Sequence, residues 1–92
     1  MKWKIIKQDS RYIVTDLDLK GVTVSHTTLL PNQSTRGHSH AHPEAYLFTT
    51  FADVLLGSAW WHVRPGQFML VQSDQFHQVV NHSSTKNAEF YS

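Results

Sequence analysis

The feature that most constrains the fold of this sequence is its succession of short β-favouring segments. Nine runs rich in Val, Ile, Thr and aromatic residues alternate with turn-forming residues, and no segment keeps a helical apolar period over three turns. Strands this short and closely spaced are typical of sandwiches and closed barrels. We therefore predict an all-β chain with strands over residues 2–7, 11–17, 22–30, 45–50, 54–56, 59–63, 68–71, 77–80 and 88–91.

The length and composition of the chain fit a small ordered protein. With 92 residues there is room for one hydrophobic core, so we expect a single domain over residues 1–92. Hydrophobic residues make up 40% and charged residues 16%, which is the balance of a globular chain. The net charge of +1 comes from scattered basic residues, which argues against a nucleic-acid partner. The absence of Cys excludes disulfides and thiolate metal ligands.

Targeting signals and exposed aromatic residues give further expectations. No apolar run approaches the roughly 20 residues of a membrane span, and residues 1–7 are too short for a signal peptide. We expect a cytoplasmic protein without a membrane partner. Trp60 and Trp61 are adjacent, so one should enter the core and the other should stay exposed or meet a partner. With Trp3 near the start of the chain, this pattern predicts a homodimer.

The histidines point to a metal site. Seven of the 92 residues are His, and three of them lie within five positions at His38, His40 and His42. Glu44, one of only two Glu in the chain, follows directly. Residues two apart in a strand share a face, so His38 and His40 should point the same way, and Glu44 keeps that parity. If His77 from a later strand meets them, three imidazoles and one carboxylate can hold a divalent metal with positions left open.

The spacing of these residues resembles the two sequence motifs of the cupin family. The first motif is Gly, five residues, His-x-His, three or four residues, Glu, six residues and Gly, and it aligns from Asn32 through Glu44. The second is Gly, five residues, Pro-x-Gly, two residues, His, three residues and Asn, and it aligns from Gly66 through His77 to Asn81. The resemblance covers roughly residues 20–82. It implies a double-stranded β-helix, or jelly-roll barrel.

The resemblance also implies a ligand set, with His38, His40, Glu44 and His77 holding one divalent metal. Fe, Mn, Ni, Zn, Co and Cu all suit such ligands. The sequence departs from the motifs at four other positions. Asn32 replaces a Gly, which is tolerable because Asn also adopts left-handed backbone. Phe51, Gln72 and Asp74 replace Gly, Pro and Gly, so the first hairpin should differ and the loop before His77 should be less rigid.

Other residues are candidates for a substrate pocket above the metal. Tyr46 and Phe48 share the parity of Glu44, and ordinary barrel filling is the alternative for both. Tyr46 has the stronger claim to a catalytic role, because its phenol can donate a hydrogen bond to a bound oxygen. Asn81 shares the face of His77 and is a candidate for substrate binding. Arg36 is a candidate anchor for an anionic substrate.

The remaining histidines are interpreted separately. His42 is a candidate catalytic base, with a solvent-facing position as the alternative. We expect His26, His62 and His82 to be ordinary core or surface residues.

Three functions are consistent with this sequence. The first is an isomerase or lyase in which the metal acts as a Lewis acid on a small oxygenated metabolite such as a sugar phosphate or a uronate. The second is an iron-dependent dioxygenase that uses the open positions for oxygen and substrate. The third is a non-catalytic module that binds a sugar or another metabolite. The first two make the protein an enzyme with a small-molecule substrate, and we favour the first.

Overall fold

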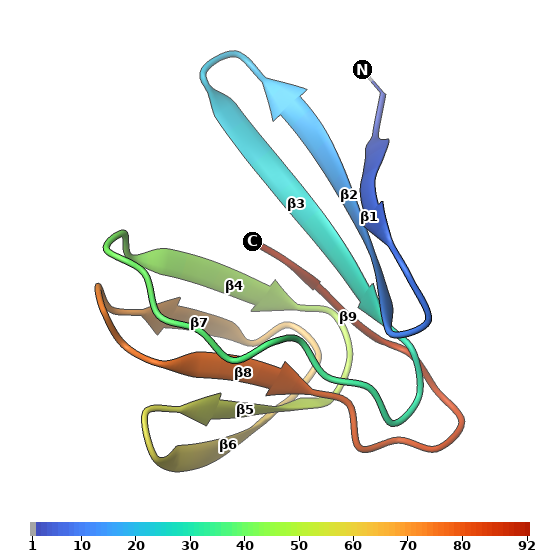
Figure 1. Cartoon of the computed structure of the whole chain (residues 1–92), viewed down its shortest axis with the longest axis vertical. Coiled ribbons are helices and arrows are strands. Elements are labelled where there is room, and N and C mark those ends of the chain that lie inside the picture. Colours follow the sequence, from blue (N-terminus) through green and yellow to red (C-terminus); the bar gives the residue numbers. More distant parts are fainter. Residues whose placement is uncertain (1) are drawn as a thin grey trace.

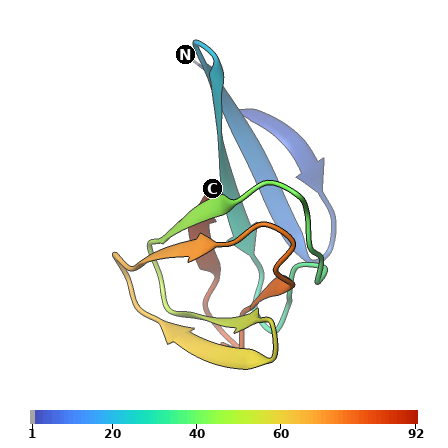
Figure 2. The same ribbon diagram turned by 90° about the vertical axis from the view of Figure 1, so that its left-hand side faces the viewer.

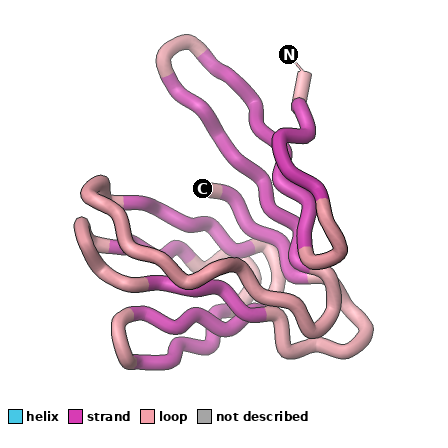
Figure 3. The backbone as a smooth tube through the Cα atoms, in the orientation of Figure 1, coloured by secondary structure: helices cyan, strands magenta, loops and turns pink. Residues whose placement is uncertain are grey.

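The structure is a computed structural model that describes residues 2–92. In this range the chain forms nine strands and no helix, as predicted (Figures 1 and 3). The strands are β1 (Lys4–Gln8), β2 (Tyr12–Leu19), β3 (Val22–Leu29), β4 (Glu44–Phe48), β5 (Ala52–Leu56), β6 (Ala59–Val63), β7 (Phe68–Val71), β8 (His77–Val80) and β9 (Ala88–Tyr91). Consistent with the absence of helix, no part of residues 2–92 forms a helix able to cross a membrane.

The strands form two antiparallel sheets. The larger sheet has the order β1-β2-β3-β9-β4-β7, and the smaller has the order β6-β5-β8. Figure 1 shows the smaller sheet below β4 and β7, and Figure 2 shows the same molecule from the side. The core lies between the sheets and consists of Tyr12, Leu29, Tyr46, Phe48, Ala52, Val54, Val63, Met69, Val71, Val79, Ala88 and Phe90. The predicted all-β jelly-roll class is confirmed.

Period-two burial explains why these segments are strands. In β4, Tyr46 and Phe48 are buried and Leu47 between them is exposed. In β8, His77 and Val79 are buried and the residues between and after them are half-buried. Alternation of this kind arises because successive side chains of a strand point to opposite faces. One face of each strand therefore supplies the core.

Two local predictions were wrong. The predicted strands over residues 45–50 and 54–56 leave Ala52 and Asp53 in the connection between them, but these two residues begin β5, where they pair with Val63 and His62. Trp60 and Trp61 were expected to differ in burial, yet their exposed fractions are 52% and 51%. The reason is the position of β6 at the edge of the smaller sheet, where the inward-pointing Trp61 is also left uncovered.

The segment before β4 lies along the free side of β8, although it is not a regular strand. Thr35 N–H donates to the Val79 carbonyl at 2.9 Å, and Asn81 N–H donates to the Gln33 carbonyl at 2.9 Å. Ser34 and Val80 form an isolated antiparallel bridge. These bonds extend the smaller sheet by one irregular strand, so that residues 33–38 run along β8 from its end to its start.

Candidate metal centre

Four side chains from three parts of the chain converge at one end of the barrel. His38, His40, Glu44 and His77 each offer one ligand atom, and these atoms all lie within 4.8 Å of one another. Glu44 begins β4 and His77 begins β8, while His38 and His40 belong to the segment that runs along β8. The structure therefore brings together the four residues predicted as metal ligands, in a cluster consistent with a metal site.

Backbone hydrogen bonds fix the positions of the ligand-bearing residues. His38 N–H donates to the His77 carbonyl at 3.1 Å, and His77 N–H donates to the His38 carbonyl at 2.9 Å. This reciprocal pair brings the two imidazole rings side by side, with centroids 4.3 Å apart and ring planes inclined at 59°. Asp74 N–H donates to the His40 carbonyl at 2.7 Å, which ties the next turn of the segment to the loop before β8.

Each imidazole of the cluster presents the same nitrogen to its centre. In all three rings Nδ1 lies within hydrogen-bond distance of a backbone carbonyl, which can only accept, so Nδ1 carries the proton. The Nε2 atoms of His38 and His77 are then left with a free lone pair, the state in which imidazole binds a metal. His40 Nε2 donates a hydrogen bond to Glu44 Oε2, and this proton would leave when a metal binds. The pairs are His38 with the Arg36 carbonyl (3.1 Å), His40 with the His42 carbonyl (2.6 Å) and His77 with the Gln75 carbonyl (3.0 Å).

A divalent cation fits the donor set at the centre of the cluster. Glu44 Oε2 lies 2.8 Å from His40 Nε2 and 3.6 Å from His77 Nε2. His77 Nε2 is fully buried and has no hydrogen-bond partner in the described part of the chain. A buried nitrogen of this kind is costly unless something binds it. Three imidazole nitrogens and one carboxylate oxygen at this spacing are suitable ligands for Fe, Mn, Ni, Zn, Co or Cu.

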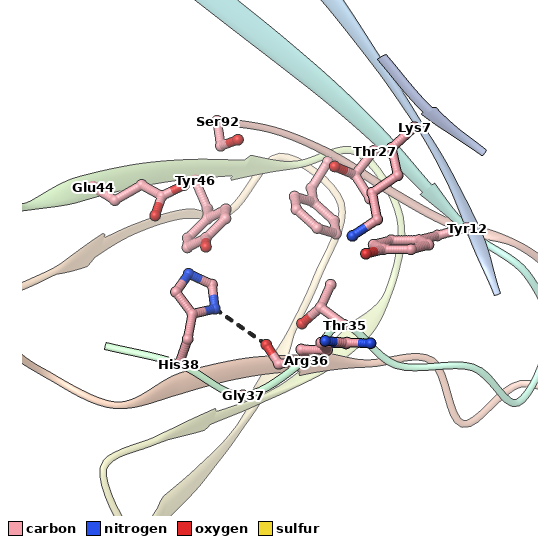
Figure 4. A pocket seen from close by; sticks show the side chains of 11 residues that line it. Lys7, Tyr12, Thr27, Thr35, Arg36, Gly37, His38, Glu44, Tyr46 and Ser92 are labelled. Carbon is pink, nitrogen blue, oxygen red and sulfur yellow. Dashed lines mark hydrogen bonds between the residues drawn. The ribbon is translucent and has the colours of Figure 1, made fainter. Parts of the chain in front are cut away.

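A cavity of about 390 Å³ adjoins the cluster (Figure 4). His38, Glu44 and Tyr46 line one end of it, and Arg36 lies on the opposite side of the figure. Three further wall residues come from strands β1 to β3 and were not predicted: Lys7, Tyr12 and Thr27. No sequence pattern indicated them, because their place in the wall depends on how the first three strands fold over the barrel.

Tyr46 is the predicted catalytic residue that the structure places in the cavity wall. Its side chain is 5% exposed, and its ring centroid lies 6.1 Å from that of His77. Burial raises the pKa of the Tyr46 phenol, and the nearby Glu44 carboxylate raises it further. Tyr46 therefore stays protonated at neutral pH and acts as a hydrogen-bond donor toward the cavity.

Three other predicted site residues have different surroundings. Phe48 is fully buried, packs on Phe90 with ring centroids 5.4 Å apart, and is not among the described residues that line the cavity. Asn81 is also buried, and its amide donates to the carbonyls of Leu29, Leu30 and Lys86. Asn81 thus holds the turn after β8 rather than facing the cavity.

His42 is exposed, and its backbone carbonyl, not its imidazole, contacts the cluster through His40. Its ring is not part of the cavity wall formed by residues 2–92. The structure therefore gives His42 a positioning contact by its main chain.

The other histidines have ordinary partners. His26 stacks near Tyr91, with ring centroids 4.7 Å apart, and lies 3.3 Å from the Glu89 carboxylate. His62 and His82 both donate through Nδ1 to Asp53 on the outer face of the smaller sheet.

Comparison with solved structures identifies the architecture as the cupin fold. The chain superposes on a cupin-2 domain protein from Rhodospirillum rubrum with a TM-score of 0.81 and 13% identity, covering 98% of this chain and 66% of that one. It superposes on a cupin 2 conserved barrel domain protein from Salinispora arenicola with a TM-score of 0.79 and 19% identity, covering 96% and 77%. A predicted oxalate decarboxylase from Thermotoga maritima gives a TM-score of 0.78 and 17% identity, covering 87% and 76%.

No family model matches the sequence, and no curated protein matches it. At the identities found, the solved structures define the fold, and the reaction has to be argued from the site itself. The predicted resemblance to small cupins is confirmed at the level of the fold.

Proposed function

We propose that the protein is a metal-dependent enzyme that acts on a small oxygenated metabolite, as an isomerase or lyase. The observation that carries the proposal is the convergence of three imidazoles and Glu44 beside a cavity of about 390 Å³. When bound, a divalent metal supplies a Lewis acid that polarises a substrate oxygen. A cavity of this size is in the range that holds a small molecule.

Two other groups support this reading. Tyr46 lies between the cluster and the rest of the cavity wall, where its phenol donates a hydrogen bond to a substrate oxygen (Figure 4). The apolar rings behind it, Phe48 and Phe90, keep water out of the barrel side of the site. Tyr46 is therefore proposed to orient the substrate and to stabilise negative charge that develops on its oxygen.

Metal content is the first test of this function. In His77→Ala, we expect bound metal, measured by elemental analysis after purification and exposure to each candidate ion, to fall at least tenfold, because the most buried ligand is lost. His62→Ala serves as the matched control, since this imidazole binds Asp53 far from the cluster, and it should keep wild-type metal content. Equal metal content in His77→Ala and the wild type would show that the assigned ligands are wrong.

The reaction class is tested by turnover. Metal-loaded protein is assayed against panels of sugar phosphates and uronates, with and without oxygen. Turnover independent of oxygen, lost in Tyr46→Phe and in His77→Ala, supports the proposal. Turnover that requires Fe(II) and consumes oxygen would instead show a dioxygenase. Ligand binding without turnover in either condition would show a binding module.

A further inference from the structure

A pair of basic side chains lies at the end of the cavity opposite the metal cluster. Lys7 comes from β1 and Arg36 from the segment that precedes the ligands, so residues 29 positions apart line the same cavity. Figure 4 shows the Lys7 ammonium group above the Tyr12 ring and the Arg36 side chain below it. The Lys7 Nζ atom lies 5.1 Å from the centroid of that ring.

Nothing in the described structure neutralises these two cations. Neither Lys7 nor Arg36 forms an ion pair within residues 2–92, whereas Arg11 nearby is paired with Asp9 at 3.0 Å. The one acidic side chain of the cavity wall is Glu44, which belongs to the metal cluster at the other end. The end with Lys7 and Arg36 is therefore positively charged, and neither cation has an ion-pair partner among residues 2–92.

Hydroxyl groups complete the same end of the cavity. Tyr12 is buried, with 7% of its surface exposed, and Thr27 is buried with 6% exposed, and both line the cavity. Neither side-chain hydroxyl makes a hydrogen bond to another part of the described chain, so both are free for a ligand. Charged donors from Lys and Arg, together with neutral hydroxyl donors, are the groups that bind carboxylate and phosphate oxygens.

We propose that Lys7 and Arg36 form an anion-binding subsite, and that the substrate carries a carboxylate or phosphate group at one end and a metal-binding oxygen at the other. The metal-binding oxygen of the substrate rests on the proposed function. The anion-binding subsite rests only on Lys7, Arg36 and the residues around them. It narrows the substrate to a small anion and assigns part of the specificity to the N-terminal strand β1.

Titration followed by NMR tests the subsite, because the ¹H–¹⁵N spectrum of so small a protein reports each amide. The probes are glycerate, which carries a carboxylate, and glycerol 3-phosphate, which carries a phosphate. Uncharged glycerol is the control. We expect saturable shifts at Thr27 and Gly37 with the anions and none with glycerol. The probe with the lower Kd identifies the anion chemistry.

Variants show whether the two cations are responsible. Lys7→Met and Arg36→Gln should each raise the Kd about tenfold, since each removes a charge-assisted bond. Lys4→Met and Arg64→Gln change the net charge equally but lie outside the cavity wall, and they should stay within twofold of the wild type. Wild-type affinity in both cavity variants, or equal losses in the two controls, would overturn the subsite.

The two proposals fail in different ways. Each titration is run on protein treated with EDTA and on zinc-loaded protein, and metal content is measured for each variant. Anion binding that depends on Lys7 and Arg36 in protein unable to hold metal would uphold the subsite and overturn the metal-dependent function. Normal metal binding without saturable anion shifts in either form would overturn the subsite alone.

Discussion

Asp53 is the residue that fastens the outer face of the smaller sheet. One carboxylate oxygen accepts a hydrogen bond from His62 on β6, and the other accepts from His82 beyond β8, so Asp53 joins the two strands that flank β5. Burial alone raises the pKa of Asp53, but the hydrogen bonds from His82 and His62 more than offset this and hold the pKa below its usual value of 3.8.

We predict that Asp53→Asn lowers stability in a pH-dependent way. Because the pKa of Asp53 is lower in the folded protein, its ionised form stabilises the fold above the unfolded pKa, and this contribution disappears as the pH falls through the folded pKa. The variant should lose about 1 kcal/mol of unfolding free energy near neutral pH, a modest figure because both imidazoles are solvent-exposed. Urea unfolding at several pH values measures it, and a difference that persists unchanged in acid would contradict it.

The residues of the site show what strand parity can and cannot predict. Parity places His77 and Asn81 on the same face of β8, and the structure confirms that both point inward and are buried. Two residues four positions apart in a strand, however, are separated by about 13 Å. Asn81 therefore lies at the other end of the barrel from His77. The same reasoning separates Tyr46, in the cavity wall, from Phe48, in the core. Parity predicts the face, but depth along the barrel depends on tertiary packing.

At the scale of elements, the segment that carries His38 depends on close packing against the loop before β8. A Cβ atom added to Gly37 would lie 2.2 Å from the tip of the Phe76 ring, which is closer than any stable contact. Gly37 and Phe76 directly precede His38 and His77, two residues of the candidate metal cluster. The contact between them therefore sets the distance between the two ligand-bearing segments.

We predict that Gly37→Ala lowers the unfolding free energy by about 1–2 kcal/mol, the usual effect of overpacking. The value lies at the lower end because Phe76 is 39% exposed and its ring can turn outward. In a Phe76→Ala background the same substitution should have almost no effect, since the clashing atoms are gone. Urea unfolding of the four proteins gives the coupling. Equal effects of Gly37→Ala in both backgrounds would mean that the clash does not govern this packing.

Most strands were predicted correctly from the sequence. Two loop positions explain why the cupin motifs tolerate substitution. Asn32 and Asp74 occupy motif positions of Gly and have φ values of 62° and 61°, so they keep the left-handed backbone that Gly would adopt. The expectation for Asn32 is thereby confirmed. The start of β5 was mispredicted because Ala and Asp have low strand propensity, whereas pairing with β6 and β8 fixes this segment in a strand.

At the scale of the whole molecule, the outer face of the larger sheet is strongly apolar. Leu47 on β4 pairs with Phe68 on β7 and with Tyr91 on β9, and Leu70 lies beside them on β7. The exposed fractions of Phe68 and Leu70 are 62% and 61%. A continuous apolar surface of this kind on a sheet favours association, and we propose that a second copy of the chain covers it as a homodimer.

The dimer prediction concerns Leu70. Leu70→Lys places a charge at the centre of this face and should shift the protein toward the monomer, because a charge buried at an apolar interface is unfavourable. Light scattering during size-exclusion chromatography should give twice the 10.6 kDa chain mass for the wild type and the single mass for the variant. Phe51→Lys is the control, since Phe51 is 70% exposed but lies near Asp53, away from this face. A monomeric wild type at high concentration would refute the proposal.

The last prediction links the metal centre to the stability of the whole chain. A chain of 92 residues buries a small core, and an ion that binds only the folded state adds stability by mass action. The cluster joins three segments: the irregular segment along β8, the start of β4 and the start of β8. At free metal one hundred times its Kd, the gain is about 2.7 kcal/mol, since the gathered ligands disperse on unfolding.

For a chain of this size, such a gain corresponds to a rise in Tm of about 10–20 °C. Thermal unfolding of EDTA-treated protein, with and without added metal, measures it. His62→Ala should show the same rise as the wild type, because Asp53 and its partners lie outside the cluster. His77→Ala should show almost none, and its unliganded Tm should lie below that of the unliganded wild type, because Ala leaves a cavity in the core and removes the hydrogen bond to the Gln75 carbonyl. An equal rise in His77→Ala would mean that the ion stabilises the fold from somewhere else.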